Sequence, residues 1–296
     1  MSPTQKKQIV LSILFIYYFK VESKSSNEII KEINNLKLKH NYNLINVKEL
    51  RTLPSFDGIA EFKFKSFSFK MLNIAKDDGV VLKYLWRDKY ENTSLNLWYD
   101  ITRDDGFSID IGAHTGIYSI IGSINKKLPL MVSIEPHFLN YGRLLDNLKI
   151  NSLSAKHCYL AAASNQNGTL KFDASVNTYH TSGGKISEKG AISVNAIMID
   201  NINFTKKVVA MKIDTEGHEY SVLLGAQKTI QIYKPEILFE INSESFNLCT
   251  NLLKKYGYNF YYINEEKEKI VPVYSFDENL LKDEGSNCLA TIKNYS

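Results

Sequence analysis

Hydrophobic and polar positions change their spacing several times along the chain. Between residues 24 and 56, apolar residues such as Ile29 and Ile33 recur at helical spacing within a polar segment, which predicts a helix. From residue 59 to residue 74, apolar and polar residues alternate, which is the period of a half-buried strand or hairpin. Residues 82–101 return to a helical pattern and predict one helix.

Strands and helices alternate from Phe107 onward. Short apolar runs predict strands at residues 107–111, 129–136, 155–163, 208–214, 236–242, 258–264 and 270–276. Two added strands are predicted at residues 168–174 and 191–200, and helices at residues 116–124, 138–151, 219–233 and 244–256. Repeated strand–helix units favour an α/β fold, with a mainly parallel sheet covered by helices on both faces.

Composition agrees with an ordinary globular protein. The chain has 296 residues, of which 44% are hydrophobic and 23% charged. We assign residues 1–106 to an N-terminal extension of helices and a β-hairpin, and residues 107–296 to the main domain. The net charge of +4 is mild, so no nucleic-acid partner is expected. The three cysteines share no metal-binding or CxxC spacing, which favours reduced thiols.

The apolar segment IVLSILFIYYF, residues 9–19, leaves three interpretations open. It is shorter than the roughly 20 residues that span a bilayer, and no small-residue cleavage site follows it. A helix packed on the main domain, peripheral membrane contact and export each fit the pattern. We expect a cytoplasmic protein, with membrane association through this segment as the alternative.

The stretch FSIDIGAHTGIYSI, residues 107–120, reads as a strand, a tight turn and the start of a helix. It lacks the three glycines of a dinucleotide-binding turn, and Asp110 precedes its first glycine, where a carboxylate would repel a pyrophosphate. Gly112 lets the backbone approach a ligand closely, and Glu135 ends the next strand, where a carboxylate commonly accepts hydrogen bonds from ribose hydroxyls. These features favour an adenosine-bearing ligand without a pyrophosphate, for which S-adenosylmethionine is the natural candidate.

Four ordered stretches carry a family resemblance that runs from about Tyr90 to Ile241. They are FSIDIGAHTGIYS, SIEPHFLNYGRLLDNLKIN, VNAIMIDNI, and MKIDTEGHEYSVLLGA together with KPEILFEIN. On these motifs the chain resembles the FkbM-type S-adenosylmethionine-dependent methyltransferases, although the family more often has Asn where His114 stands. The resemblance implies a Rossmann-like class I methyltransferase sheet of seven strands, mostly parallel with the last antiparallel. It also implies O-methylation, often of sugar or polyketide-type hydroxyls.

Ligands of open α/β sheets bind outside the carboxyl ends of the strands, so polar and small residues there are the candidates for cofactor binding. We expect Glu135 to bind the ribose and Gly116 to allow tight packing of helix on strand. The full set expected to bind the cofactor is Asp110, Gly112, His114, Gly116, Glu135 and Ala162, with Ser164 as the alternative to Ala162 near the adenine.

Methyl transfer to a hydroxyl requires alignment of the acceptor and removal of its proton. In one scheme His218 or Asp214 is the general base, with Glu216 close by in the same turn. In the other, Asp214, Glu240 and Asn242 hold Mg²⁺ or a similar divalent cation that acidifies the hydroxyl. A purely structural role for the carboxylates at the start of the following helix is the third interpretation.

Three aromatic residues, Trp86, Trp98 and Tyr99, could stack on a sugar acceptor, but core packing is the favoured interpretation. The leading hypothesis is an O-methyltransferase acting on a sugar, a glycan or a related metabolite. A catalytically inactive binding protein with the same fold is the main rival, and an NAD-dependent oxidoreductase is the second. The sequence names neither the acceptor nor the oligomeric state.

Overall fold

The protein forms two compact units, residues 1–90 and 91–296, in the computed structural model. The structure describes residues 25–39, 41–42, 45–124, 130–174, 183–241, 243–278 and 286–295. The division lies earlier than the boundary expected between residues 106 and 107, because helix α5 (Asn92–Ile101) packs on α6 and on strands of the second unit. The apolar segment at residues 9–19 lies outside the described residues.

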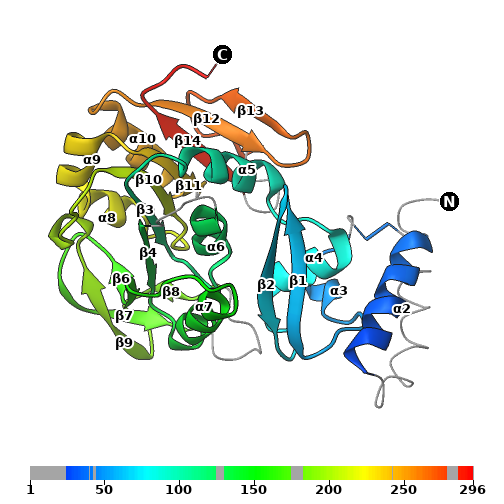
Figure 1. Cartoon of the computed structure of the whole chain (residues 1–296). Helices are drawn as coiled ribbons and strands as arrows, with labels where there is room; N and C mark the ends of the chain where they lie inside the picture. The colour runs from blue at the N-terminus through cyan, green and yellow to red at the C-terminus, as the bar shows by residue number, and fades with distance from the viewer. Residues whose placement is uncertain are drawn as a thin grey trace. The chain divides into compact units, whose positions relative to one another are not determined.

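The first unit combines helices with one hairpin (Figure 1). Its elements are α2 (Ser26–Lys39), α3 (Val47–Leu50), β1 (Gly58–Phe64), β2 (Phe67–Asn73) and α4 (Gly79–Arg87). The strands β1 and β2 pair in antiparallel register, as the alternating pattern predicts. Their inward-facing aromatic side chains, Phe62 and Phe69, pack against Tyr84 of α4.

The second unit is built on an eight-stranded sheet in the order β13-β12-β14-β11-β10-β3-β4-β5. Its strands are β3 (Phe107–Ile111), β4 (Leu130–Glu135), β5 (Cys158–Leu160), β10 (Val208–Ile213), β11 (Glu236–Glu240), β12 (Asn259–Asn264), β13 (Lys269–Pro272) and β14 (Asn287–Thr291). The five strands from β5 to β11 are parallel, and β14 runs antiparallel to both of its neighbours. The predicted fold class is confirmed, with β13 as an eighth strand at the edge.

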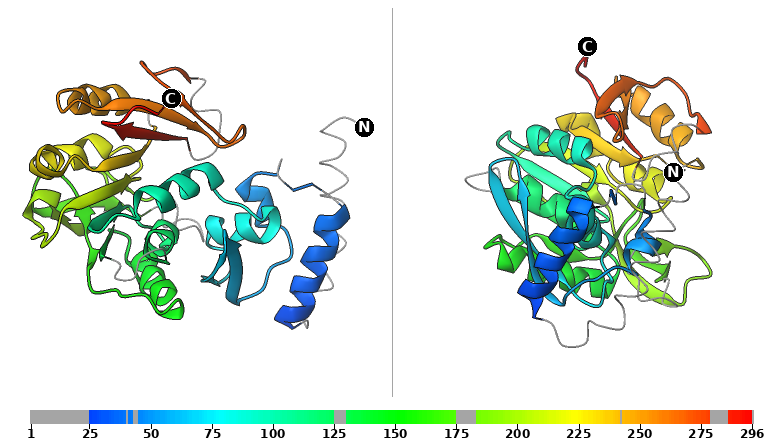
Figure 2. Two further views of the ribbon diagram at one scale, coloured as in Figure 1. Left: turned by 45° about the horizontal axis from the view of Figure 1, so that its top comes forward. Right: turned by 90° about the vertical axis from the view of Figure 1, so that its right-hand side faces the viewer.

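Two groups of helices cover the sheet (Figures 1 and 2). The first group is α5, α6 (Ile117–Ile124) and α7 (Phe138–Ile150); the second is α8 (Glu219–Leu224), α9 (Gln227–Tyr233) and α10 (Phe246–Lys254). Strands β3 and β10 are buried along their whole length, so their side chains point alternately toward the first and the second group of helices. Odd-numbered residues such as Ile109 and Ile213 join the core with the second group. Even-numbered Asp110 and Lys212 reach α6 instead.

A smaller sheet of the order β6-β9-β7-β8 lies between β5 and β10 in the chain. It consists of β6 (Ala162–Ala163), β7 (Gly168–Asp173), β8 (Lys185–Ile186) and β9 (Ile192–Ile197), and the 3-10 helix η1 (Ile199–Asn201) follows. The strand predicted over residues 155–163 is therefore two short strands in different sheets. The added strands predicted after it are present.

Two helices predicted as continuous are broken. The helix predicted over residues 82–101 is α4 followed by α5, because Asp88 and Glu91 adopt left-handed backbone conformations between them. The helix predicted over residues 219–233 is α8 followed by α9, with Gly225 and Ala226 between.

Strand β14 was not predicted. None of the helices in the described part of the chain is long and apolar enough to cross a membrane.

Candidate functional site

The turn after β3 lies against the loop after β10. The N–H groups of Gly112 and Ala113 both donate to the carbonyl of Ile134, and the N–H of Asp214 donates to the carbonyl of Ile111. Gly112 has φ +75°, and a Cβ on it would lie 1.7 Å from the carbonyl oxygen of Asp214. Only glycine allows these two loops to approach so closely. The expected contact between Gly112 and a cofactor stays a prediction.

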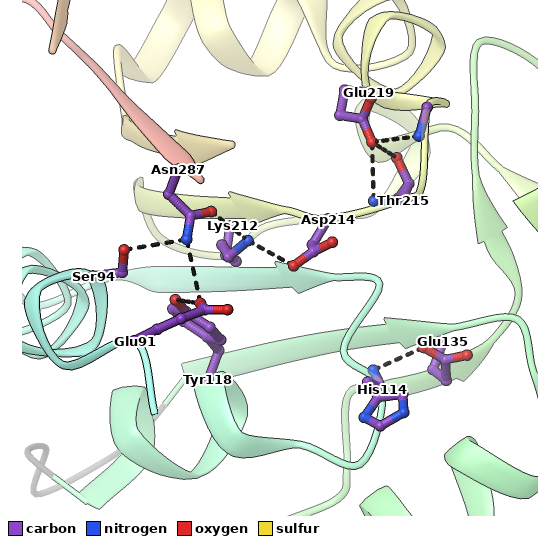
Figure 3. A network of polar contacts seen from close by, with 11 residues as sticks. Glu91, Ser94, His114, Tyr118, Glu135, Lys212, Asp214, Thr215, Glu219 and Asn287 are labelled. Atoms are coloured by element: carbon purple, nitrogen blue, oxygen red, sulfur yellow. Dashed lines mark hydrogen bonds and ion pairs between the residues drawn. The ribbon is translucent and has the colours of Figure 1, made fainter. Parts of the chain in front are cut away.

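Glu135 is fixed by backbone N–H groups from both sides. Its Oε2 accepts from His114 N at 2.8 Å (Figure 3). Its Oε1 accepts from His137 N, also at 2.8 Å. Burial raises the pKa of Glu135, although the neighbouring His114 and these hydrogen bonds oppose the shift. The Asn140 side chain also forms a hydrogen bond to this carboxylate. Since the two oxygens of a carboxylate offer about four lone-pair sites, capacity remains to accept a ribose hydroxyl.

Apolar side chains are exposed at the same edge of the sheet as Glu135. Leu160 is its partner across the β4–β5 pairing and is 43% exposed, and Phe138 begins α7 at 56% exposed. A fixed hydroxyl acceptor beside exposed apolar side chains fits the ribose and adenine of S-adenosylmethionine. The residues of this edge therefore suit the cofactor expected from the sequence.

Asp110 is buried against α6. Its Oδ2 accepts from Ser119 Oγ at 2.6 Å, and Ser119 Oγ lies 2.7 Å from Ser133 Oγ. Burial raises the pKa of Asp110 to about 6, while the Ser119 hydrogen bond and the Lys212 ammonium act in the opposite direction. The carboxyl group thus anchors α6 to the sheet. Its expected contact with the cofactor stays a prediction.

Gly116 and Ala162 both occupy tightly packed positions. A Cβ on Gly116 would lie 2.6 Å from Leu144 Cδ1, so this glycine allows α6 to approach α7. Ala162 is buried in β6, two residues before Ser164, whose Oγ lies 3.0 Å from Nε2 of His218. The structure thus brings the end of the third predicted strand next to one of the two candidate bases.

Asp214 follows β10 and forms an ion pair with Lys212. The distance from Lys212 Nζ to Asp214 Oδ2 is 3.0 Å; the lysine side chain is 1% exposed and the aspartate side chain 33%. Burial acts to lower the pKa of Lys212, but the carboxylates of Asp214 and Glu91 together raise it above its usual value. A charged ammonium therefore lies directly behind one of the two candidate bases.

The loop between Asp214 and α8 is organised by one buried side chain, Glu219. Glu219 is completely buried, and its Oε1 accepts from the N–H groups of Thr215 and Gly217 at 3.1 and 3.0 Å (Figure 3). Its Oε2 accepts from Ser245 Oγ of the segment before α10. The structural interpretation therefore holds for Glu219, while Glu216, at φ +54°, lies exposed in the same loop.

Glu240 ends β11 beside the same loop. Its Oε2 is buried and has no hydrogen-bond partner within the described residues. Burial, followed by the charges of Asp214 and Glu216, raises the pKa of Glu240. Within the described ranges no three His, Cys, Asp or Glu side chains are grouped as a metal site. Asn242, the third expected ligand, lies outside the described residues.

His218 caps no backbone group and is half-buried before α8. Burial lowers its pKa, so the imidazole is neutral near pH 7, as a base must be.

The aromatic residues considered as a stacking surface, Trp86, Trp98 and Tyr99, are buried, which confirms core packing.

Comparisons with known proteins give a family match and distant structural similarity. The family model for the methyltransferase FkbM domain matches residues 110–260, just over half of the chain. No curated protein matches the chain. The methyltransferase FkbM of Methylobacillus flagellatus KT shares 16% identity at a TM-score of 0.42, over 73% of this chain and 54% of its own.

Two other solved structures show similar values. An S-adenosylmethionine-dependent O-methyltransferase of Thermotoga maritima shares 9% identity at a TM-score of 0.40, over 80% of this chain and 79% of its own. A putative methyltransferase of Streptococcus mutans, solved with S-adenosylhomocysteine, shares 10% identity at a TM-score of 0.39, over 66% of this chain and 96% of its own.

Proposed function

The chain belongs to the FkbM methyltransferase family of S-adenosylmethionine-dependent enzymes, and we propose that it transfers a methyl group to a hydroxyl of a sugar, a glycan or a related metabolite. The family assignment supports the reaction class. The observation that supports the cofactor site is the buried Glu135 carboxylate, fixed by two backbone N–H groups at the carboxyl end of β4. We place the reaction in the cytoplasm and expect a small-molecule or glycan acceptor.

The cofactor would lie across the carboxyl ends of β3, β4 and β5. There Glu135 would accept the ribose hydroxyls, and Phe138 and Leu160 would contact the adenine. S-adenosylmethionine supplies an electrophilic methyl group on its sulfonium sulfur. The chain must then exclude water and present the acceptor oxygen in line with that methyl group.

Asp214 is the residue we propose to act on the acceptor hydroxyl. Its Oδ2 is held by Lys212, and its Oδ1 makes no hydrogen bond to any described residue, on a side chain that is one-third exposed. Such a carboxylate can accept the hydroxyl hydrogen bond, orient the oxygen and take the proton as the new C–O bond forms. His218, neutral and held at Nε2 by Ser164, is the second candidate for this base.

A divalent cation at Asp214, Glu240 and Asn242 stays a separate prediction. It would polarise the hydroxyl as a Lewis acid instead of removing its proton through a side chain alone. Assays after exhaustive chelation, with Mg²⁺ added back in a parallel sample, measure this dependence. Restoration of lost activity by Mg²⁺ would favour the metal scheme.

Calorimetry with S-adenosylhomocysteine and with NAD tests the proposed function. We expect wild-type protein to bind the first and not the second. Glu135→Gln should weaken S-adenosylhomocysteine binding about tenfold or more, because the amide loses charge-assisted acceptor capacity. Asp146→Asn is the matched control, since Asp146 is an exposed carboxylate on α7. Binding of NAD alone would contradict the proposal.

Mass spectrometry of glycan and metabolite extracts incubated with protein and S-adenosylmethionine identifies the acceptor. The proposal predicts products heavier by about 14 Da, the mass of a methyl group that replaces a hydrogen. Protein that binds S-adenosylhomocysteine but yields no such product would instead support the inactive binding protein.

A further inference from the structure

Lys212 is a completely buried cation in the middle of a buried sheet. It stands on β10 two residues before Asp214, so both side chains point toward the α5–α6 layer. A buried ammonium without partners would lose its proton or destabilise the fold. The partners of Lys212 therefore decide what it does.

Three groups lie around the Lys212 ammonium. Its Nζ donates to Asp214 Oδ2 at 3.0 Å and to Asn287 Oδ1 at 3.1 Å, and it lies 5.0 Å from the ring centroid of Tyr118 (Figure 3). Two N–H donors are thus used in hydrogen bonds, and the ring face adds a cation–π contact. The side chain is consequently held in one position.

The partners behind Lys212 are themselves fixed. The amide nitrogen of Asn287 donates to Glu91 Oε2 at 3.2 Å and to Ser94 Oγ at 3.1 Å, both at the start of α5. The hydroxyl of Tyr118 donates to the same Glu91 oxygen at 2.6 Å. One continuous network thus connects β14, α5 and α6 to the ammonium, and the ammonium connects it to Asp214.

This arrangement leaves Asp214 with one oxygen fixed from inside the protein and the other without a hydrogen bond to the described residues. We propose that Lys212, supported by Asn287, is a positioning residue that holds the Asp214 carboxylate aimed at the acceptor hydroxyl. The inference rests on the proposed function and deepens it. Lys212 itself touches neither cofactor nor acceptor in this scheme, and it acts through Asp214.

A double-mutant cycle between Lys212 and Asp214 tests this proposal. Lys212→Met, Asp214→Asn and the double variant are compared by transfer of a tritiated methyl group from S-adenosylmethionine to the acceptor-containing extract. We expect each single variant to lower kcat by about tenfold or more, with the KM for S-adenosylmethionine within about twofold of wild type. The double variant should match Asp214→Asn, because a residue that acts through Asp214 has nothing left to position.

A surface ion pair provides the matched control. Lys206 Nζ lies 2.8 Å from Asp105 Oδ1 with both side chains exposed, so Lys206→Met should leave kcat and KM unchanged. If Lys212→Met does not fold, Asn287→Ala replaces it in the test. This variant keeps the Lys212 ammonium but removes the side chain that supports it, and it is combined with Asp214→Asn in the same kind of double-mutant cycle. The proposal would be overturned if the fold-losses in kcat of the single variants multiplied in a double variant. A wild-type kcat in the Lys212 or Asn287 variant would overturn it as well.

Failure of the proposed function gives a different result. Wild-type protein that neither binds S-adenosylhomocysteine nor transfers the label contradicts the proposed function before any variant is compared. Wild-type protein that transfers the label, with multiplicative losses in the cycle, contradicts only the role of Lys212. Full turnover by Asp214→Asn contradicts both Asp214 as the base and Lys212 as its positioning residue.

Discussion

Asp110 shows what burial does to a single ionisable residue in this sheet. Its folded-state pKa of about 6 lies above the ordinary value of 3.8, so the native protein binds the proton more tightly than the unfolded chain does. The stability contributed by the protonated form is therefore present at low pH and is lost as the pH rises through about 6.

Asp110→Asn should remove this pH dependence while keeping a side chain that can accept from Ser119. The free energy of unfolding of the variant minus that of wild type should rise by about 2 kcal/mol between about pH 4.5 and pH 7. Chemical denaturation at several pH values measures the difference. A constant difference across that range would show that Asp110 stays ionised in the folded protein.

At the scale of residues, the sequence predicted which side chains lie at strand ends better than it predicted which side chains they bond to. Glu135 and Asp214 were expected at strand ends, and the structure places them there, because the ends of buried apolar runs can be read from the pattern. Lys212 was missed as an organising residue, and Glu219 was considered only as a favourable charge at the start of a helix. Lysine within the otherwise apolar run VVAMKI was a usable signal, since a charge in a buried strand requires partners. Their partners Asn287 and Ser245 lie far along the chain, and no local pattern reveals them.

At the scale of elements, close backbone contacts explain breaks that periodicity did not predict. Gly225 ends α8, and a Cβ on it would lie 1.9 Å from the carbonyl oxygen of Ser164. The N–H of Ser164 donates to the carbonyl of Ile197 in β9, so this backbone cannot easily move away. The break between α8 and α9 thus holds the small sheet against the second group of helices.

Gly225→Ala should destabilise the protein by about 3 kcal/mol, because the added methyl group overlaps fixed backbone atoms. Gly142→Ala is the matched control. Gly142 lies within α7 with nothing within 4 Å of the position of a Cβ, so alanine there should stabilise the helix by about 0.5–1 kcal/mol. Urea denaturation measures the free energy of unfolding of both variants. Equal changes in this free energy for Gly225→Ala and Gly142→Ala would contradict the close contact at Gly225.

At the scale of the whole molecule, the alternation of strands and helices correctly predicted the parallel sheet. It did not predict β14, a short strand between β11 and β12 that comes after them in the chain. Pairing order is set by contacts between distant segments, whereas periodicity reports only on local burial. The family resemblance supplied the antiparallel last strand that the pattern itself could not supply.

The described residues expected to bind the cofactor all lie in the second unit. We therefore predict that a fragment of residues 91–296 folds cooperatively and binds S-adenosylhomocysteine with a dissociation constant within about threefold of the full chain. Thermal unfolding and calorimetry test this. Loss of cofactor binding in a folded fragment would contradict this assignment of the site.

The position of β14 has a consequence for synthesis. A ribosome delivers β14 after β11 and β12, yet the finished sheet needs β14 between them. Until then β11 and β12 are separate unpaired edges, and Lys212 still lacks Asn287. Strands β12 and β13 can therefore join the central sheet in their native places only once β14 is available, and the same late strand also completes the support of the candidate catalytic carboxylate.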